Sequence, residues 1–218
     1  MSGRLRVSLL MLLCLALALS CTRRPASTAD VPRSLPAEYK ISVAPFTQPS
    51  ETSQLITGHI PEMQGRIARD ELVMLDRAFR HILQTGTKRD YTFIPRRDLP
   101  TDGVAYHAAE RPQALPKWLA YGRSAGAQYL LIPQVLDWHQ REGSSAGVVR
   151  AAHVRLEFFL VRVEDGTILK RTVFEEKQVG LTENLLTVGS FFKRRGAWIT
   201  AEELAEEAMQ LAREEMHL

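Results

Sequence analysis

The sequence predicts a domain of the α/β (α+β) class, with helices packed on one mixed sheet in the order β-α-β-α-β-β-β-α. Three observations lead to this fold. An apolar residue recurs every three or four positions through 68–82, a nearly continuous apolar run fills 127–138, and Asp165-Gly166 separates two long segments. These patterns are typical of an amphipathic helix, a strand buried on both faces and a β-hairpin.

The first half of the domain is predicted to alternate strand and helix. YKISVAPF (39–46) predicts a short strand, and a helix follows through 68–85. YTFIP (91–95) predicts the second strand, and ALPKWLAYGRSAG (114–126) predicts a shorter helix in which Gly122 is unfavourable. Strands separated by helices favour parallel pairing through right-handed crossovers.

The second half is predicted to be antiparallel. Residues 152–164 and 167–176 flank the Asp-Gly turn as the two strands of a hairpin. In the first of these strands the even positions 154–160 are apolar, whereas Arg155 and Glu157 are charged. We therefore expect one face of this strand to pack and the other to meet solvent at the strand's start.

Three further segments complete the predicted fold. Residues 139–150 are polar and contain glycines and serines, so a flexible loop is expected there. Residues 179–199 are expected to form a short helix and a loop. Thr200 and Glu203 have the spacing of a capping box, which predicts a last helix that starts there and runs to about Met216.

Residues 1–20 are predicted to be a signal peptide. Arg4 and Arg6 precede an unbroken apolar stretch, 7–20, that ends in small residues. Such a stretch is too short for a helix across a hydrocarbon core of about 30 Å, which needs about 20 residues. An uncleaved membrane anchor is therefore the less favoured alternative.

The signal ends in Ala18-Leu19-Ser20-Cys21, which resembles the lipobox of bacterial lipoproteins. In that family the cysteine thiol is diacylglycerylated and a dedicated peptidase cleaves before it, so the resemblance implies a covalent lipid at Cys21. Two or three acyl chains hold a protein stably on a bilayer. The alternative is an ordinary signal peptide in which Cys21 is incidental. Thr22 is not the aspartate that retains lipoproteins in the inner membrane, so the resemblance favours a periplasm-facing outer-membrane location.

Residues 21–38 are expected to be a flexible tether, because prolines alternate there with small polar residues and no apolar period is present. Arg23 and Arg24 lie beside the predicted lipid and are candidates for contact with anionic head groups. The folded domain is then 39–218. Cys14 lies inside the signal, so this domain has no cysteine for a disulfide or a thiolate metal site.

The charge of the chain argues against a nucleic-acid partner. The formal net charge is +3, but the first twenty residues hold two arginines and no acid. Without them, 26 basic residues face 25 acidic ones. An excess of Lys and Arg, which nucleic-acid binding requires, is therefore missing.

No motif identifies a catalytic reaction, a cofactor or a metal. GRSAG (122–126) matches G-x-S-x-G around Ser124, but it follows a helix and precedes a strand, the reverse of a nucleophile elbow. The glutamates of 202–207 are expected to form a solvated helix face. A metal site assembled by folding could combine His59 and His107, both in predicted loops, but we expect no metal, no cofactor besides the lipid and no small-molecule substrate. The histidines show no HExxH or other short metal spacing: His59, His81, His107, His139, His153 and His217.

The segment FFKRRGAW (191–198) is the predicted protein-binding surface. Aromatic residues beside cations match the composition of interface anchors. Two alternatives remain open: the aromatic residues cap the core while the cations face water, or the cations contact anionic lipid head groups. The residues singled out are Phe191, Phe192, Lys193, Arg194, Arg195 and Trp198.

The element order, with ISVAPF (41–46) at its start and AGAQYLLIPQV (125–135) before the hairpin, resembles TolB amino-terminal and CsgG-like domains. Residues 183–209 are similar to the tail of uncharacterised bacterial lipoproteins. These resemblances imply a membrane-tethered, non-catalytic periplasmic adaptor that binds envelope proteins or itself. The charged residues of the hairpin argue against a CsgG-like pore, because charge is costly on a lipid-facing strand. The alternative function is a hydrolase-like periplasmic enzyme whose site the sequence does not reveal.

Overall fold

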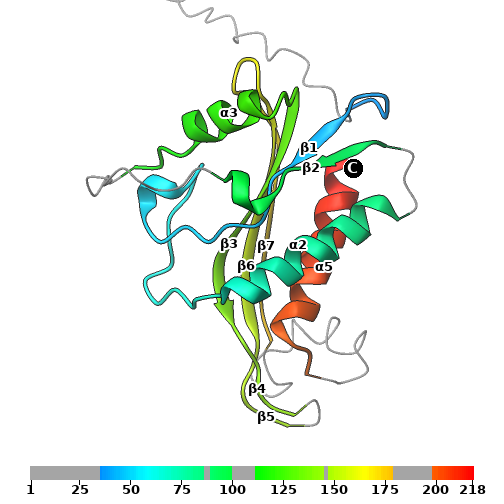
Figure 1. Cartoon of the computed structure of the whole chain (residues 1–218). Helices are drawn as coiled ribbons and strands as arrows, with labels where there is room; N and C mark the ends of the chain where they lie inside the picture. Colours follow the sequence, from blue (N-terminus) through cyan, green and yellow to red (C-terminus); the bar gives the residue numbers. More distant parts are fainter. Residues whose placement is uncertain (1–34, 86–88, 100–110, 145–146, 179–197) are drawn as a thin grey trace, which may run out of the picture. The chain divides into compact units, whose positions relative to one another are not determined.

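Five strands form one mixed sheet in the order β2-β1-β3-β6-β7 in the computed structural model, which describes residues 35–85, 89–99, 111–144, 147–178 and 198–218 (Figure 1). β1 pairs in parallel with β2 and β3, whereas β3, β6 and β7 are antiparallel neighbours. The predicted class and element order are confirmed. The strands are β1 (Ile41–Val43), β2 (Tyr91–Phe93), β3 (Tyr129–His139), β6 (His153–Arg162) and β7 (Ile168–Lys177).

Helices cover both faces of the sheet. α2 (Arg69–Gln84) and α5 (Ala201–Met216) pack on one side, the α2/α5 face, and α3 (Leu115–Ser124) packs on the other, the α3 face (Figure 1). Phe158 and Phe159 are neighbours in β6, and their side chains enter the two separate buried clusters on these faces. The long strands are therefore apolar on both sides where helices cover them, as the continuous apolar run predicts.

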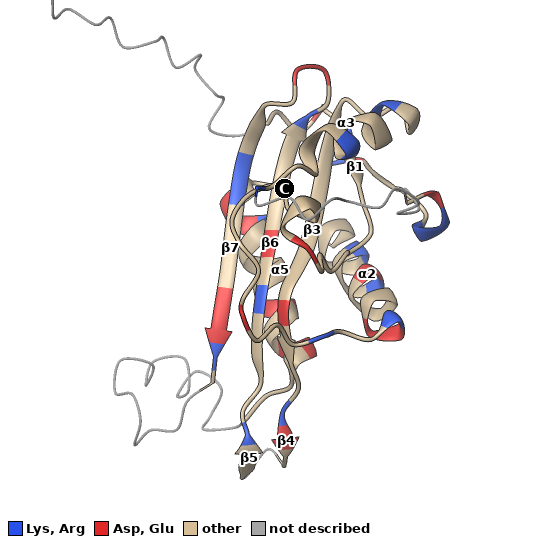
Figure 2. Ribbon diagram, turned by 90° about the vertical axis from the view of Figure 1, so that its left-hand side faces the viewer, with Lys and Arg blue, Asp and Glu red and all other residues tan. Residues whose placement is uncertain are grey.

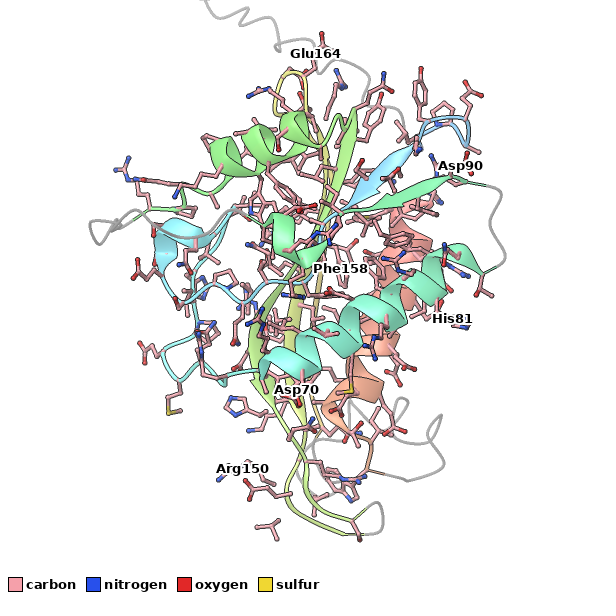
Figure 3. The ribbon with its side chains drawn as sticks, in the orientation of Figure 1. Asp70, His81, Asp90, Arg150, Phe158 and Glu164 are labelled. Atoms are coloured by element: carbon pink, nitrogen blue, oxygen red, sulfur yellow. The ribbon has the colours of Figure 1, made fainter. Side chains whose placement is uncertain are left out.

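Three phenylalanines form the centre of the cluster on the α2/α5 face. The rings of Phe46, Phe79 and Phe158 have centroids 5.4–6.0 Å apart and tilted or edge-to-face orientations. Figure 3 shows Phe158 inside the domain, whereas Asp70 and His81 lie on the outer side of α2. Aromatic rings in such geometry contribute more than their buried area alone.

The last helix begins at the predicted capping box. The Thr200 hydroxyl accepts the Glu203 N–H at 3.3 Å, and the Glu203 carboxylate accepts the Thr200 N–H at 2.7 Å. Small side chains on the buried stripe of α5 let the helix lie close to the sheet and to α2. The stripe is Ala201, Leu204, Ala205, Ala208, Met209, Ala212 and Met216.

The loop expected at 139–150 is in part a two-stranded ribbon, which corrects that prediction. β4 (Glu142–Gly143) pairs antiparallel with β5 (Val148–Arg150), and an ion pair of 2.8 Å joins Arg150 to Glu142. Gly143 has a φ of +113° and a Cβ there would meet the Gly147 carbonyl at 2.6 Å, so glycine permits the close pairing. Glycines that suggested a loop instead permit a tight ribbon.

The solvent-facing side predicted for the start of β6 is also wrong. The Arg155 side chain is only 15% exposed and that of Glu157 only 1%. Residues 48–65 cross the α3 face beside α3: the Gln54 carbonyl accepts the Gln134 side-chain N–H at 3.2 Å, and Gly58 lies near Glu157. A covering segment without regular structure thus buries the charged face.

Several predicted segments lie outside the described residues: the signal peptide, all but the end of the tether, and most of the short helix and loop of 179–199. Among the helices in the described ranges, none is long and apolar enough to cross a membrane.

The close approach of α3 to the sheet yields the first prediction. A Cβ at Gly122 would lie 2.9 Å from a methyl group of Val163, which is itself 2% exposed. Gly122→Ala should therefore destabilise the domain by about 1–3 kcal/mol through overpacking, although alanine favours helices.

Urea unfolding of Gly122→Ala, Val163→Ala and the double variant measures this effect. Because Val163→Ala removes the clashing methyl groups, the double variant should lose less stability than the sum of the single losses. Strict additivity would show that the two positions do not press on each other.

Candidate functional site

A β-bulge in β3 turns polar residues onto the α3 face of the sheet. The pairing of β3 with β6 shifts between Val135 and Asp137, so that Asp137 lies opposite Arg155 and His139 opposite His153. Bulges insert one extra residue and re-aim the side chains beyond it. Without the bulge, Asp137 and His139 would point into the core of the α2/α5 face, because side chains alternate along a strand.

Three side chains converge beyond the bulge, and we call them the Asp137 cluster: Asp137, His139 and His153. Asp137 Oδ1 lies 3.1 Å from His139 Nε2, and Asp137 Oδ2 lies 3.1 Å from His153 Nδ1. The two imidazole rings are parallel within 3°, with centroids 5.8 Å apart. Each oxygen of one carboxylate therefore faces one imidazole.

The backbone fixes the Asp137 carboxylate in this position. Oδ1 accepts the Gly65 N–H at 2.6 Å and the Trp138 N–H at 3.1 Å. A Cβ at Gly65 would lie 2.2 Å from the Trp138 carbonyl oxygen, so no other residue fits this approach. The Gln64 side chain holds the same crossing by donating to the Leu136 carbonyl at 2.8 Å. The carboxylate is 4% exposed and its orientation is set.

A second group of charges continues the polar face along β6 and β7, and we call it the Glu157 network: Arg155, Glu157, Arg171 and Glu175. Glu157 accepts two hydrogen bonds from Arg171, at 2.9 and 3.1 Å, and a longer one of 3.4 Å from Arg155. Arg155 lies 3.6 Å from Glu175, which in turn lies 3.7 Å from His153 Nε2. Figure 2 shows basic and acidic segments alternating along both strands.

The Glu157 network compensates its own charge. The Glu157 carboxylate is 1% exposed, and its Oε2 accepts two charge-assisted hydrogen bonds from Arg171, which offset the cost of burying it. This network therefore has a structural role: it lets charged residues occupy a covered sheet face. The Asp137 cluster differs, because one carboxylate there faces two imidazoles with no arginine among the three side chains.

A cleft of about 280 Å³ lies beside α3, next to the short 3-10 helices η1 (Thr52–Gln54) and η2 (Arg96–Asp98). Its wall includes the apolar side chains of Leu72 and Trp118 and the cationic side chains of Arg96 and Lys117.

Asp76 of α2 holds Arg96, one of the residues that line this cleft. Its Oδ1 accepts the Phe46 N–H at 2.7 Å, and its Oδ2 accepts two N–H groups of Arg96, at 2.7 and 3.1 Å. Burial raises the pKa of the Asp76 carboxyl, and the Phe46 N–H and the Arg96 guanidinium oppose that rise. Arg96 is therefore the cation that makes the ionised carboxylate tolerable.

Most of the predicted interaction residues lie outside the described part of the chain. These are Cys21, Arg23, Arg24 and residues 191–195. Trp198 lies within the described residues. It is half-buried, and its backbone carbonyl accepts a hydrogen bond from the Arg141 side chain, just before β4. The structure thus attaches the end of the predicted binding segment to the ribbon end of the sheet.

Ser124 lies at the C-terminus of a helix, as predicted. It ends α3, is exposed, and donates to the Tyr121 carbonyl at 2.8 Å, while Gly126 has the positive φ (+66°) of a helix C-terminus. His59 is exposed and His107 lies outside the described residues. Of the α5 glutamates, Glu203, Glu206 and Glu207 are exposed as predicted, whereas Glu202 is half-buried and accepts a hydrogen bond from the Gln140 side chain at 2.6 Å.

Sequence reasoning missed the Asp137 cluster because it looked for ligands within short motifs. Two signals were present. Asp137 and His139 stand two apart in one strand, and His153 opens the next long strand, which antiparallel pairing brings opposite His139. The apolar run through 127–138 suggested that Asp137 belongs to a strand buried in the core. The bulge, which turns its side chain to the α3 face, could not be seen in that run.

Comparisons with known proteins give distant structural neighbours. No family model and no curated protein matches the sequence. The PelC dodecamer from Paraburkholderia phytofirmans is 15% identical with a TM-score of 0.46, over 84% of this chain and 92% of that one. The LpoB C-terminal domain from Salmonella enterica is 17% identical (TM-score 0.36; 66% and 86% covered), and lipoprotein GNA1162 from Neisseria meningitidis is 12% identical (0.36; 72% and 97%). Likeness at this level assigns no function to the chain.

The Asp76–Arg96 contact predicts a pH-dependent loss of stability. Arg96→Ala should cost about 2 kcal/mol at pH 7, because the partly buried carboxylate loses two charge-assisted hydrogen bonds on Oδ2. The raised pKa of Asp76 sets the direction of the pH dependence. Protonated Asp76 carries no charge that Arg96 must neutralise, so the stability lost in Arg96→Ala should shrink as pH falls through that raised pKa towards 3.8.

Urea unfolding of wild type and variant at each pH measures the difference. Arg97→Ala is the matched control, because the Arg97 side chain is 85% exposed and should be near neutral at every pH. A loss for Arg96→Ala that is constant from pH 7 to 4 would contradict the assignment to Asp76.

Proposed function

We propose that this chain is a lipid-anchored lipoprotein of the bacterial envelope and that its domain, 39–218, is a non-catalytic interaction module. The observation that carries the proposal is Cys21, placed directly after an apolar signal and followed by arginines and prolines. Acyl chains on its thiol and amine would give stable membrane attachment, each buried methylene contributing about 0.8 kcal/mol.

The start of the domain suits an anchored protein. Arg89, which is 8% exposed, donates to the carbonyls of Leu35, Pro36 and Tyr39 at 2.6–3.0 Å. The chain is thus fixed to the domain from Leu35 onward. Residues 22–34 span at most about 45 Å when fully extended, at about 3.5 Å per residue. An anchor at Cys21 would hold the domain within that distance of the membrane surface.

The finer parts of the proposal come from the sequence. Thr22 favours the outer membrane, and Arg23 and Arg24 would contact anionic head groups. Phe191, Phe192 and the basic trio that follows, together with Trp198, would supply the protein-binding surface. The element order supports kinship with TolB amino-terminal and CsgG-like domains. Partners would be envelope proteins or further copies of this chain.

The anchor is tested by Cys21→Ser in the full-length protein. The variant should lose incorporation of a radiolabelled or clickable fatty acid and should move from the membrane to the soluble envelope fraction. Cys14→Ser is the matched control: it lies in the signal and should leave both readouts unchanged. Membrane fractionation of Cys21→Ser equal to that of the parent would refute the proposal.

The interaction surface is tested by photo-crosslinking in intact cells. A photoreactive residue at Phe192 should give discrete adducts of reproducible mass, because the proposed interface buries that side chain. The control places the photoreactive residue at Met63, which is 87% exposed and lies in the segment 48–65 that crosses the sheet. This position should give no discrete adducts. Equal adduct patterns at the two positions would remove 191–198 as the interface.

A further inference from the structure

We propose that Asp137, His139 and His153 bind a divalent transition-metal ion, for which Zn²⁺ is the best match. This site goes beyond the anchoring function and does not depend on it. One ligand atom from each residue can be chosen so that all three lie within 4.8 Å of one another. Asp137 and His139 are two residues apart in β3, and His153 lies opposite His139 in β6. All three side chains therefore project from one face of a rigid sheet.

The donor set fits the chemistry of zinc. Two imidazole nitrogens and one carboxylate oxygen are ligands that Zn²⁺ accepts at about 2.0–2.2 Å, with water in a fourth position. Tetrahedral bonds of that length separate ligand atoms by about 3.4 Å. Asp137 Oδ1 lies 3.1 Å from His139 and Oδ2 lies 3.1 Å from His153, and one ligand atom from each residue can be chosen with all three within 4.8 Å. The imidazoles would have to turn towards one shared carboxylate oxygen to hold the ion.

The surroundings of the three side chains resemble the outer shell that metal ligands need. The Gly65 and Trp138 N–H groups hold one oxygen of Asp137 and leave Oδ2 free to face His153. His153 turns Nδ1 to the cluster and Nε2 towards Glu175, 3.7 Å away. A ligating histidine commonly gives its second nitrogen to a carboxylate, which fixes the ring and increases its basicity.

Charge and access also favour a cation. Asp137 and Glu175 are two carboxylates at the cluster, and Arg155, which lies opposite Asp137 in the pairing, is paired with Glu157 and Glu175. The His139 and His153 side chains are 35% and 22% exposed, so an ion and its water can reach them. A bound ion would tie the end of β3 to β6 and, through Asp137, to the segment that crosses at Gly65.

The rival explanation is that each neutral imidazole simply donates to one oxygen of Asp137. Both explanations use the same distances, but only a metal site predicts a stoichiometric ligand that depends on both histidines. A structural hydrogen-bonded cluster predicts no such ligand.

The test is a titration of the purified full-length protein, in detergent, with Zn²⁺ in competition with a chromophoric chelator. The wild type should bind one equivalent, and bound Zn²⁺ should raise its Tm. His139→Ala and His153→Ala should each weaken binding at least tenfold and lose the rise in Tm. His59→Ala and His81→Ala are the matched controls, because both histidines are exposed and lie outside the cluster, and they should bind as the wild type does.

Further variants keep the result decisive if a histidine variant folds poorly. His153→Gln retains a hydrogen-bonding side chain without a zinc-binding imidazole and should also lose the ion while keeping the circular dichroism of the wild type. Glu175→Gln should weaken binding without abolishing it. Absence of stoichiometric Zn²⁺ binding in the wild type, or binding that survives loss of both cluster histidines, would overturn the proposal.

Discussion

The register break between Val135 and Asp137 is the constraint on which the arrangement of polar and apolar side chains depends. Before the break, Leu131 and Val135 point to the α2/α5 face, and after it Trp138 does. One extra residue thus lets the strand keep apolar contacts with α2 and α5 along its length while turning Asp137 and His139 outward. A strand of strict alternation could not do both. The Asp137 cluster therefore depends on the same shift that keeps Trp138 in the core.

The same face shows how a sheet tolerates charge beneath a covering segment. Where α3 packs, the strands are apolar on both sides, with Phe159 and Val161 facing the helix. Beyond α3, the helix is replaced by residues 48–65, whose backbone carbonyls and amides need polar partners. Gln134 and Asp137 provide such partners to Gln54 and Gly65. Polar side chains in the buried strands therefore match the irregular backbone above them.

The fold could be predicted from the sequence largely because its signals are local. The period of α2, the capping box at Thr200 and the Asp165-Gly166 turn each act within a few residues, and each prediction is confirmed. The ribbon β4–β5 and the burial of Glu157 could not be predicted in this way. The ribbon is a local pairing of 142–143 with 148–150, but a polar, glycine-containing stretch has the same composition whether it pairs or not. The burial of Glu157 depends on residues 48–65, which are distant in sequence.

The candidate site was predictable only in part, for a related reason. A search for short motifs finds ligands that one helix or one turn brings together, whereas this cluster needs pairing across two strands and a shifted register. Of the predicted binding segment, the structure describes only Trp198, whose carbonyl accepts a hydrogen bond from Arg141 next to the ribbon. Its neighbours at 191–195 lie outside the described residues, so that surface stays a prediction.

Arg89 has a mechanical consequence. Its guanidinium holds the carbonyls of residues 35–39 and also approaches the His217 carbonyl at 3.4 Å, so the two ends of the domain meet at one cation. If the bilayer pulled on a lipid at Cys21, the force would enter the folded domain at this Arg89 contact. The load would then divide between β1, which continues from these residues, and the C-terminus of α5, so a force applied at the membrane would reach the sheet and the helix layer together.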